Sequence, residues 1–458
     1  MSTQANIEKR TDSPSLIGYL KEEIPMEDLR DAYSPERINS IDFVKGLAMV
    51  FIILAHTSAA WFNVNWIYIH GMVYAALDIM GPSLFVFLSA LSVIFSIKRK
   101  KGDLPEKVIR SRIYSRGFVI MGIGILYNFM AFNTGLVQTD YYFPFTLWGW
   151  NILTFIGFSQ IVSYHAMKLE KQTRAVLGLF IIFISSGIRD FIYAGKDTNL
   201  VLRFFHYIIT SPAPQVTLFP WLAVCFISTI FGEYLYEAMM DGPGPAYVGL
   251  VRLFLIWGTL MVLTGVFLPL PQPDWVPGFA LATPKELPIE EYGQMNLLSI
   301  INSNKFGVRF PGLPYFLVRG TPSAMIYQLG AALLIIGICF YLIDIKNIDN
   351  GFTKMLIYYG KVSLSLFLLH YTFVPVYFGA YSIVIFPFVV LGYVGFFGFM
   401  MFIWFKYFDG KYSPEWIMIQ MGRVGQKTGE EVKKGGKKIA ERAKETVEKL
   451  KGGKGEEG

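Results

Sequence analysis

Apolar residues dominate the chain in long runs, and polar and charged residues gather in the segments between them. A helix needs about 20 apolar residues to cross a hydrocarbon core roughly 30 Å thick. Runs of that kind occur at 42–63, 73–97, 113–133, 144–166, 174–193, 218–239, 249–270, 323–344, 354–375 and 382–405. The pattern predicts an all-α polytopic membrane bundle of about ten transmembrane helices.

Basic residues are distributed unevenly around these runs. Lys and Arg are dense after the second and fourth runs and absent near 64–72, 134–143 and 376–381. Short cytoplasmic loops carry the excess of basic residues in membrane proteins. We therefore expect a cytoplasmic N-terminus, and an even number of helices returns the C-terminus to the same side.

This orientation divides the chain into three parts. A cytoplasmic N-terminal tail covers 1–36 and a basic cytoplasmic C-terminal tail covers 421–458. The transmembrane domain between them, 37–420, contains a long outer loop at 271–320. Loops of that length are usually functional, although a cap without a binding role is an equal alternative. We expect the protein to span the plasma membrane many times.

Composition supports the membrane assignment. Only 16% of residues are charged and 53% are hydrophobic, whereas soluble domains carry roughly 25% charged residues. The net charge of +7 lies in short loops and tails, so it does not indicate nucleic-acid binding. Cys225 and Cys339 both lie in apolar runs and show neither a disulfide framework nor metal-ligand spacing, so we expect no metal.

The first apolar run carries a stripe of polar residues. Lys45 and His56 are eleven residues apart, so about three helical turns bring them to nearly the same face. Asp42 lies about 40° from that face, at the inner end. Gly46 permits close approach of another helix or a ligand. The plain alternative is that Asp42 pairs with Lys45 at the interface while His56 caps a backbone carbonyl.

Other ionisable residues are expected at the depth of His56. They are His70, Asp78, Arg189 and His370. Such groups are costly in a membrane and are functional candidates by default, and together they could provide a general base with an orienting partner. Taken singly, each is more often an interfacial or packing residue. Asp78 also precedes Gly81-Pro82, which predicts a kink.

The basic stretch 98–116 has two interpretations. It determines topology in any protein of this kind. Arg112 and Arg116 also share one helix face and could bind the phosphates of a donor at the cytoplasmic mouth. We favour the topological interpretation for the lysines and the donor interpretation for the arginines.

These motifs resemble two related groups of membrane acyltransferases. One is acyltransferase family three, and the other is the heparan-alpha-glucosaminide N-acetyltransferase catalytic-domain family. The first-run motif that carries the resemblance consists of Arg37, Asp42, Lys45-Gly46 and His56. Later motifs, closer to the second family, include His70, Asp78, Pro82, Leu218-Phe219-Pro220-Trp221 and the segment from Gly360 to His370-Tyr371. The resemblance runs through about 37–420.

The resemblance implies an enzyme that moves an acyl group, expected to be acetyl, from cytoplasmic acyl-CoA to an acceptor across the membrane. The acceptor would be a glycan or a lipid-linked sugar, attacked through oxygen or nitrogen. The catalytic histidine corresponds to His56 under one family and to His70 under the other, with Asp78 as its orienting partner. Lys45 stands where the family usually has Arg, and a lysine makes no planar two-point contact.

The residues therefore divide into three expected roles. Catalysis is assigned to His56, His70 and Asp78, and donor binding to Arg112, Arg116 and Lys45. Substrate-binding or structural polar roles are assigned to Arg37, Asp42, Arg189 and His370. The rival class is a transporter or flippase of a polar lipid or glycan, which would use the same stripe without chemistry. A homodimer is left open.

Overall fold

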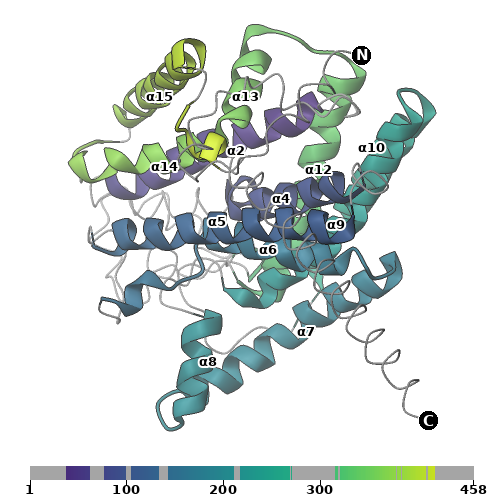
Figure 1. Ribbon diagram of the computed structural model, residues 1–458, viewed down its shortest axis with the longest axis vertical. Coiled ribbons are helices and arrows are strands. Elements are labelled where there is room, and N and C mark those ends of the chain that lie inside the picture. Colours follow the sequence, from purple (N-terminus) through teal and green to yellow (C-terminus); the bar gives the residue numbers. More distant parts are fainter. Residues whose placement is uncertain are drawn as a thin grey trace, which may run out of the picture.

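The structure is a computed structural model of the chain. It describes residues 38–61, 77–98, 105–133, 143–210, 217–268, 270, 315–317, 320–377, 379–382, 384–408 and 411–417. The regular elements of these ranges are helices (Figure 1). His70, Arg37, both tails and most of the expected outer loop lie outside the described residues.

The helices follow the predicted runs closely. The first six are α2 (Asn39–Trp61), α4 (Pro82–Lys98), α5 (Glu106–Asn133), α6 (Ile152–Ala166), α7 (Lys171–Gly195) and α8 (Leu200–Thr210). The others are α9 (Leu218–Asp241), α10 (Pro245–Phe267), α12 (Pro322–Phe340), α13 (Gly351–Lys361), α14 (Ser363–Leu369) and α15 (Phe386–Phe408). A polytopic helical membrane protein is thereby confirmed.

Short irregular helices complete the chain. They are η2 (Asp78–Met80), η3 (Phe145–Leu147), η5 (Tyr315–Leu317), the π-helical η6 (Tyr341–Ile345), η7 (His370–Thr372) and η8 (Val374–Tyr377). The kink expected at Gly81-Pro82 is present, because Gly81 has non-helical angles and α4 begins at Pro82.

Fewer helices of the described ranges qualify as membrane crossings than the sequence pattern predicts. Within the described ranges, seven helical segments are long and apolar enough to cross a membrane alone, and the bent pair α13–α14 makes an eighth. Helix α6 has only 15 residues, because Asn151 caps its start by accepting from the Thr154 N–H at 2.9 Å. Helix α5 is long but carries charged residues in its first half. Ten crossings with both termini inside therefore stay a prediction.

Three departures from the predicted elements are informative. The run expected as one helix over 354–375 is broken at Val362 and bends by 76° between α13 and α14. The run expected from residue 144 is not α-helical before Ile152. Helix α8 was not expected, because 11 residues are too few for a spanning run.

Helix pairs form the bundle, with α10 against α12, α2 against α13, α5 against α6 and α7 against α9 (Figure 1). One hydrophobic core joins α4, α6, α9, α10 and α12 around Phe87, Trp221 and Phe254. A second joins α2, α14 and α15 around Met49, Leu366 and Phe397. Helix α2 contributes to both cores, because Val44 and Ala48 belong to the first and Met49 and Ile53 to the second.

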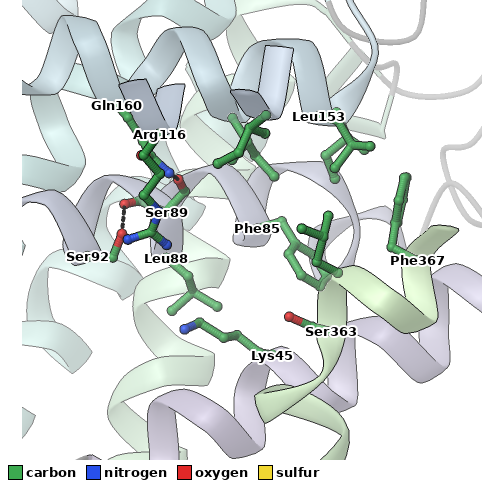
Figure 2. Close-up of a pocket in the computed structure, with 14 residues that line it drawn as sticks. Lys45, Phe85, Leu88, Ser89, Ser92, Arg116, Leu153, Gln160, Ser363 and Phe367 are labelled. Atoms are coloured by element: carbon green, nitrogen blue, oxygen red, sulfur yellow. Dashed lines mark hydrogen bonds between the residues drawn. The ribbon is translucent and has the colours of Figure 1, made fainter. Parts of the chain in front are cut away.

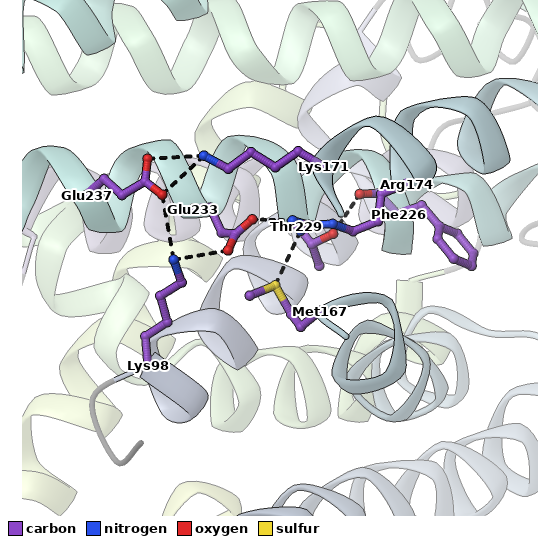
Figure 3. A network of polar contacts seen from close by, with 8 residues as sticks. All are labelled: Lys98, Met167, Lys171, Arg174, Phe226, Thr229, Glu233 and Glu237. Carbon is purple, nitrogen blue, oxygen red and sulfur yellow. Dashed lines mark hydrogen bonds and ion pairs between the residues drawn. The ribbon is translucent and has the colours of Figure 1, made fainter. Parts of the chain in front are cut away.

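Charged side chains tie α4, α7 and α9 together at one end (Figure 3). The guanidinium of Arg174 donates to the Glu233 carboxylate, and Lys98 lies 3.0 Å from the same carboxylate. Lys171 lies 3.1 Å from Glu237, which is about half exposed. Arg174 is only 2% exposed, so its charge depends on Glu233 for compensation.

This network predicts unequal effects of two neighbouring substitutions. Glu233→Gln leaves a buried guanidinium uncompensated, so we expect it to lower the free energy of unfolding by about 3 kcal/mol. Glu237→Gln removes an exposed partner and should cost less than about 1 kcal/mol. Equilibrium unfolding in mixed micelles measures both, and equal losses would show that burial does not govern this network.

Candidate active site

Helix α2 turns its polar stripe into the protein. Asp42 is 2% exposed, and one of its carboxylate oxygens lies 3.9 Å from Lys45 Nζ. The expected pairing of Asp42 with Lys45 is therefore present. The Lys45 side chain nevertheless lines the cavity described below, so the pairing does not remove its charge from the site.

A close crossing with α13 sets the position of α2. A Cβ atom added at Gly46 would lie 1.9 Å from the Leu356 carbonyl oxygen. A Cβ atom added at Gly360 would lie 1.8 Å from the Asp42 carbonyl oxygen. The two backbones thus touch where each helix has no side chain, which is the close approach predicted at Gly46.

Beyond this crossing, the two helical segments bring two histidines together. His56 Nδ1 lies 2.8 Å from His370 Nε2, and the two rings stack with centroids 5.1 Å apart. The ring of Tyr371 packs edge-on against both imidazoles. His370 is fully buried and His56 is half-buried. The sequence placed both residues at one depth without predicting that they pair.

The second nitrogen of His370 indicates the direction of the hydrogen bond. His370 Nδ1 lies 3.3 Å from the Leu366 carbonyl oxygen, which can only accept. In a neutral imidazole one nitrogen donates and the other accepts, so His370 donates through Nδ1 and accepts through Nε2. His56 therefore donates through Nδ1, and its Nε2 carries the lone pair. This tautomer is assigned from the acceptors, and it makes His56 the basic member of the pair.

A cavity of about 130 Å³ lies between α2, α4, α5, α6 and α14. Figure 2 shows Arg116, Gln160, Ser89 and Ser92 at one end and Leu153 and Phe367 at the other. The polar lining thus gives way to an apolar lining along the cavity.

The apolar end of the cavity lies close to His370. The Phe367 ring, which lines the cavity, lies 5.4 Å from the His370 ring. Phe367 belongs to α14, and His370 is the first residue of η7, which follows that helix directly. The Phe367 side chain therefore lines the cavity and also contacts the His370 ring.

Two cations face the cavity, Lys45 from α2 and Arg116 from α5. Within the described ranges no carboxylate pairs with Arg116, and its buried Nε has no hydrogen-bond partner. A guanidinium that faces a cavity without a paired carboxylate is suited to bind a phosphate or carboxylate from a ligand. Arg112 lies one turn earlier on α5 and is not among the residues that line the cavity.

Another basic residue near the start of α5 already has a partner. Lys168 Nζ lies 2.7 Å from the Glu106 carboxylate, and the Tyr164 hydroxyl donates to the same group. The Lys168 ammonium and then this hydroxyl hold the pKa of Glu106 below its usual range. Lys168 is thus neutralised locally, which distinguishes it from Arg116.

Asp78 and Arg189 occupy other parts of the protein. Asp78, in η2, is buried and accepts a hydrogen bond from Gln328 of α12 at 3.0 Å. Arg189, in α7, is 1% exposed and donates to the Gly320 carbonyl oxygen. The described contacts therefore join both residues to α12 or to the chain just before it, and neither lines the cavity.

Several residues of the site were missed by sequence reasoning. Gln160, Ser363 and Phe367 line the cavity, but a glutamine, a serine and a phenylalanine in apolar runs carry no distinctive signal. The available signal was the segment from Gly360 to His370, which was part of the resemblance but in which only His370 was given a role. In the described ranges no group of three His, Cys, Asp or Glu side chains could hold a metal ion.

The fold and site define a multi-pass helical membrane protein with a histidine pair near one end of a cavity lined by cations. Residues 37–264 match the family model described as heparan-alpha-glucosaminide N-acetyltransferase, catalytic, and this part of the chain belongs to that family. The protein is thus a membrane acetyltransferase. The comparison with curated proteins found no match. The matched range contains His56, Lys45 and Arg116 and ends before α12, so His370 and Phe367 lie beyond it.

The close contact at Gly46 predicts that the same glycine-to-alanine substitution changes stability differently at two positions. Gly46→Ala places a methyl group against the α13 backbone, so we expect a loss of about 1–3 kcal/mol of stability. Gly122→Ala, in α5, meets nothing within 4 Å and should be neutral or slightly stabilising. Thermal unfolding of the purified variants in detergent measures both. Equal melting temperatures would contradict the close contact.

Proposed function

We propose that the protein transfers an acetyl group from cytoplasmic acetyl-CoA to an extracytoplasmic acceptor such as a glycan. The observation that carries the proposal is the cavity that begins at Lys45 and Arg116 and ends at Phe367, beside the His56–His370 pair. A phosphorylated donor with a long, thin arm needs cations at one end and a base at the other.

The lining of the cavity suits the parts of acetyl-CoA in order. The phosphates would bind Arg116 and Lys45 by charge-assisted hydrogen bonds. The pantetheine arm would lie along Ser89, Gln160 and the apolar side chains towards Phe367. A cavity of about 130 Å³ is too small for the whole donor, so the adenosine part would remain outside at the mouth. Arg112, one turn from Arg116, is placed to contact it there.

His56 would act as the general base. Its Nε2 takes the proton from the acceptor hydroxyl or amine while the acceptor attacks the thioester carbonyl carbon. The carbon–sulfur bond then breaks, and the CoA thiolate leaves and takes the proton that His56 accepted, which restores the neutral imidazole. His370 keeps His56 in the required tautomer by accepting its Nδ1–H, as the orienting member of a catalytic triad does. General-base assistance of this kind contributes about 10²–10⁴-fold.

The direction of acetyl transfer follows from the position of His56 along α2. His56 lies ten residues beyond Gly46 on α2, about 15 Å farther from the cytoplasmic end. With the predicted orientation, the donor enters from the cytoplasm and the base lies in the outer half of the membrane. The family's description names an N-acetyltransferase of an α-linked glucosaminide, so an amino sugar is the first acceptor to test. The plasma membrane remains the proposed location, and His70 remains a second candidate base.

Histidine substitutions test the chemistry. We expect His56→Ala to lower kcat for acetyl transfer to methyl α-D-glucosaminide by about 10²–10⁴-fold, and His370→Ala to lower it by a similar factor because the pair acts as a unit. His165→Ala is the matched control, since that imidazole bonds Tyr114 away from the cavity. Radiolabelled acetyl-CoA in isolated membranes gives the rates. Full activity in His56→Ala would reject this base.

Donor binding separates the enzyme from a flippase. We expect the purified protein to bind acetyl-CoA, and Arg116→Gln and Lys45→Gln each to weaken binding by about tenfold, as for one lost charge-assisted hydrogen bond. Arg110→Gln, an exposed position on the same helix, should change binding little. Equilibrium dialysis measures the dissociation constants. Absence of binding by the unaltered protein would favour transport without chemistry.

A further inference from the structure

Helix α14 begins without a cap of its own. It starts directly after the break at Val362, and no side chain of that residue caps it. The first N–H groups of a helix need acceptors from outside the helix. The Glu415 carboxylate supplies one, because it accepts from the Ser365 N–H at 2.8 Å and also from the Ser365 hydroxyl. Ser365 is fully buried, so these donors depend on Glu415.

Two hydrogen bonds fix the segment after α15 that carries Glu415. The Trp404 indole donates to the Lys411 carbonyl oxygen at 3.0 Å, which holds the chain where it turns back. The Ser413 hydroxyl then accepts from the Trp416 N–H at 3.1 Å. Ser413-Pro414 is a common start of a helical turn. An acidic residue in the first turn of a helix usually interacts with the N-terminus of its own helix. Glu415 instead accepts hydrogen bonds from the first turn of α14.

Helix α14 is the element whose placement matters most for the site. It has seven residues, too few to be stable on its own. Ser363 and Phe367 line the cavity from it, and His370 follows its last residue. Ser365 and His370 are five residues apart, about 7.5 Å along a helix, so a tilt at the first turn displaces the imidazole.

We propose that Glu415 is a positioning residue for acetyl transfer, which holds α14 so that His370 stays in hydrogen-bond contact with His56. The proposal rests on the proposed function. Glu415 touches neither imidazole in any contact described above. It acts through the first turn of α14, from a cytoplasmic segment that lies beyond the residues matched by the family.

Kinetics test the positioning role. We expect Glu415→Ala to lower kcat for acetyl transfer to methyl α-D-glucosaminide by about 100-fold, the size of effect produced by a misplacement of about 1 Å. KM for acetyl-CoA should change less than kcat, because Lys45 and Arg116 are not on α14. Glu415→Gln keeps one acceptor oxygen for the Ser365 N–H and should restore part of the activity.

A double-mutant cycle separates this role from general stability. Ser365→Ala removes the hydroxyl that donates to Glu415, and Glu415→Gln weakens the same hydrogen bond from the other side. Because both substitutions act on one interaction, the double variant should lose no more activity than the stronger single variant. Asp349→Asn is the matched control, an exposed carboxylate paired with Lys354 at 3.1 Å just before α13. Additive losses, or an equal loss in the control, would overturn the proposal.

Chemical labelling tests the same idea without any activity. Diethyl pyrocarbonate should modify His370 slowly in the unaltered protein and at least about tenfold faster in Glu415→Ala, with His165 unchanged as the internal reference. If no acetyl transfer is found but His370 still becomes reactive, the proposed function fails while the positioning of α14 by Glu415 stands. Unchanged His370 labelling, or an equal rise at His165, would overturn the positioning role.

Discussion

The contact between the backbones of α2 and α13 at Gly46 and Gly360 is the constraint on which the site depends. A side chain at either position would lie less than 2 Å from the opposite backbone, so the crossing exists only because both residues lack one. Small residues allow this approach in membranes, where packing rather than water exclusion drives helix association. Each histidine lies ten residues after its glycine, at positions 56 and 370.

Two straight helices that cross separate steadily on either side of the contact. The segment after Gly360 avoids this, because it breaks at Val362 and bends by 76°, which keeps α14 beside α2 as far as His370. The break has a cost, since it exposes backbone donors in the interior of the protein. Glu415 offsets that cost at Ser365. The helix crossing, the break at Val362 and the cap by Glu415 are thus linked features. Together they bring the imidazoles of His56 and His370 into contact.

The sequence allowed the class of fold to be predicted because membrane helices must be long and apolar regardless of their neighbours. The polar stripe of α2 and the close approach at Gly46 followed from helical periodicity and from the lack of a side chain. The break at Val362 could not be predicted, because valine is compatible with a continuous apolar helix. The His56–His370 pair was also hidden, since 314 residues separate its members and only tertiary packing brings them together.

The placement of charge explains why Arg116 in α5 and Arg174 in α7 serve different purposes. Arg174 is compensated within the protein by Glu233, as expected for a charge whose role is to hold helices together. Arg116 has no such carboxylate in the described ranges and faces a cavity instead. Leaving a cation without a protein partner is unfavourable for folding alone. The arrangement is reasonable when an anionic ligand completes it. A cavity with this cation at one end and Phe367, which contacts His370, at the other is consistent with the proposed donor, whose phosphates would bind at the first end.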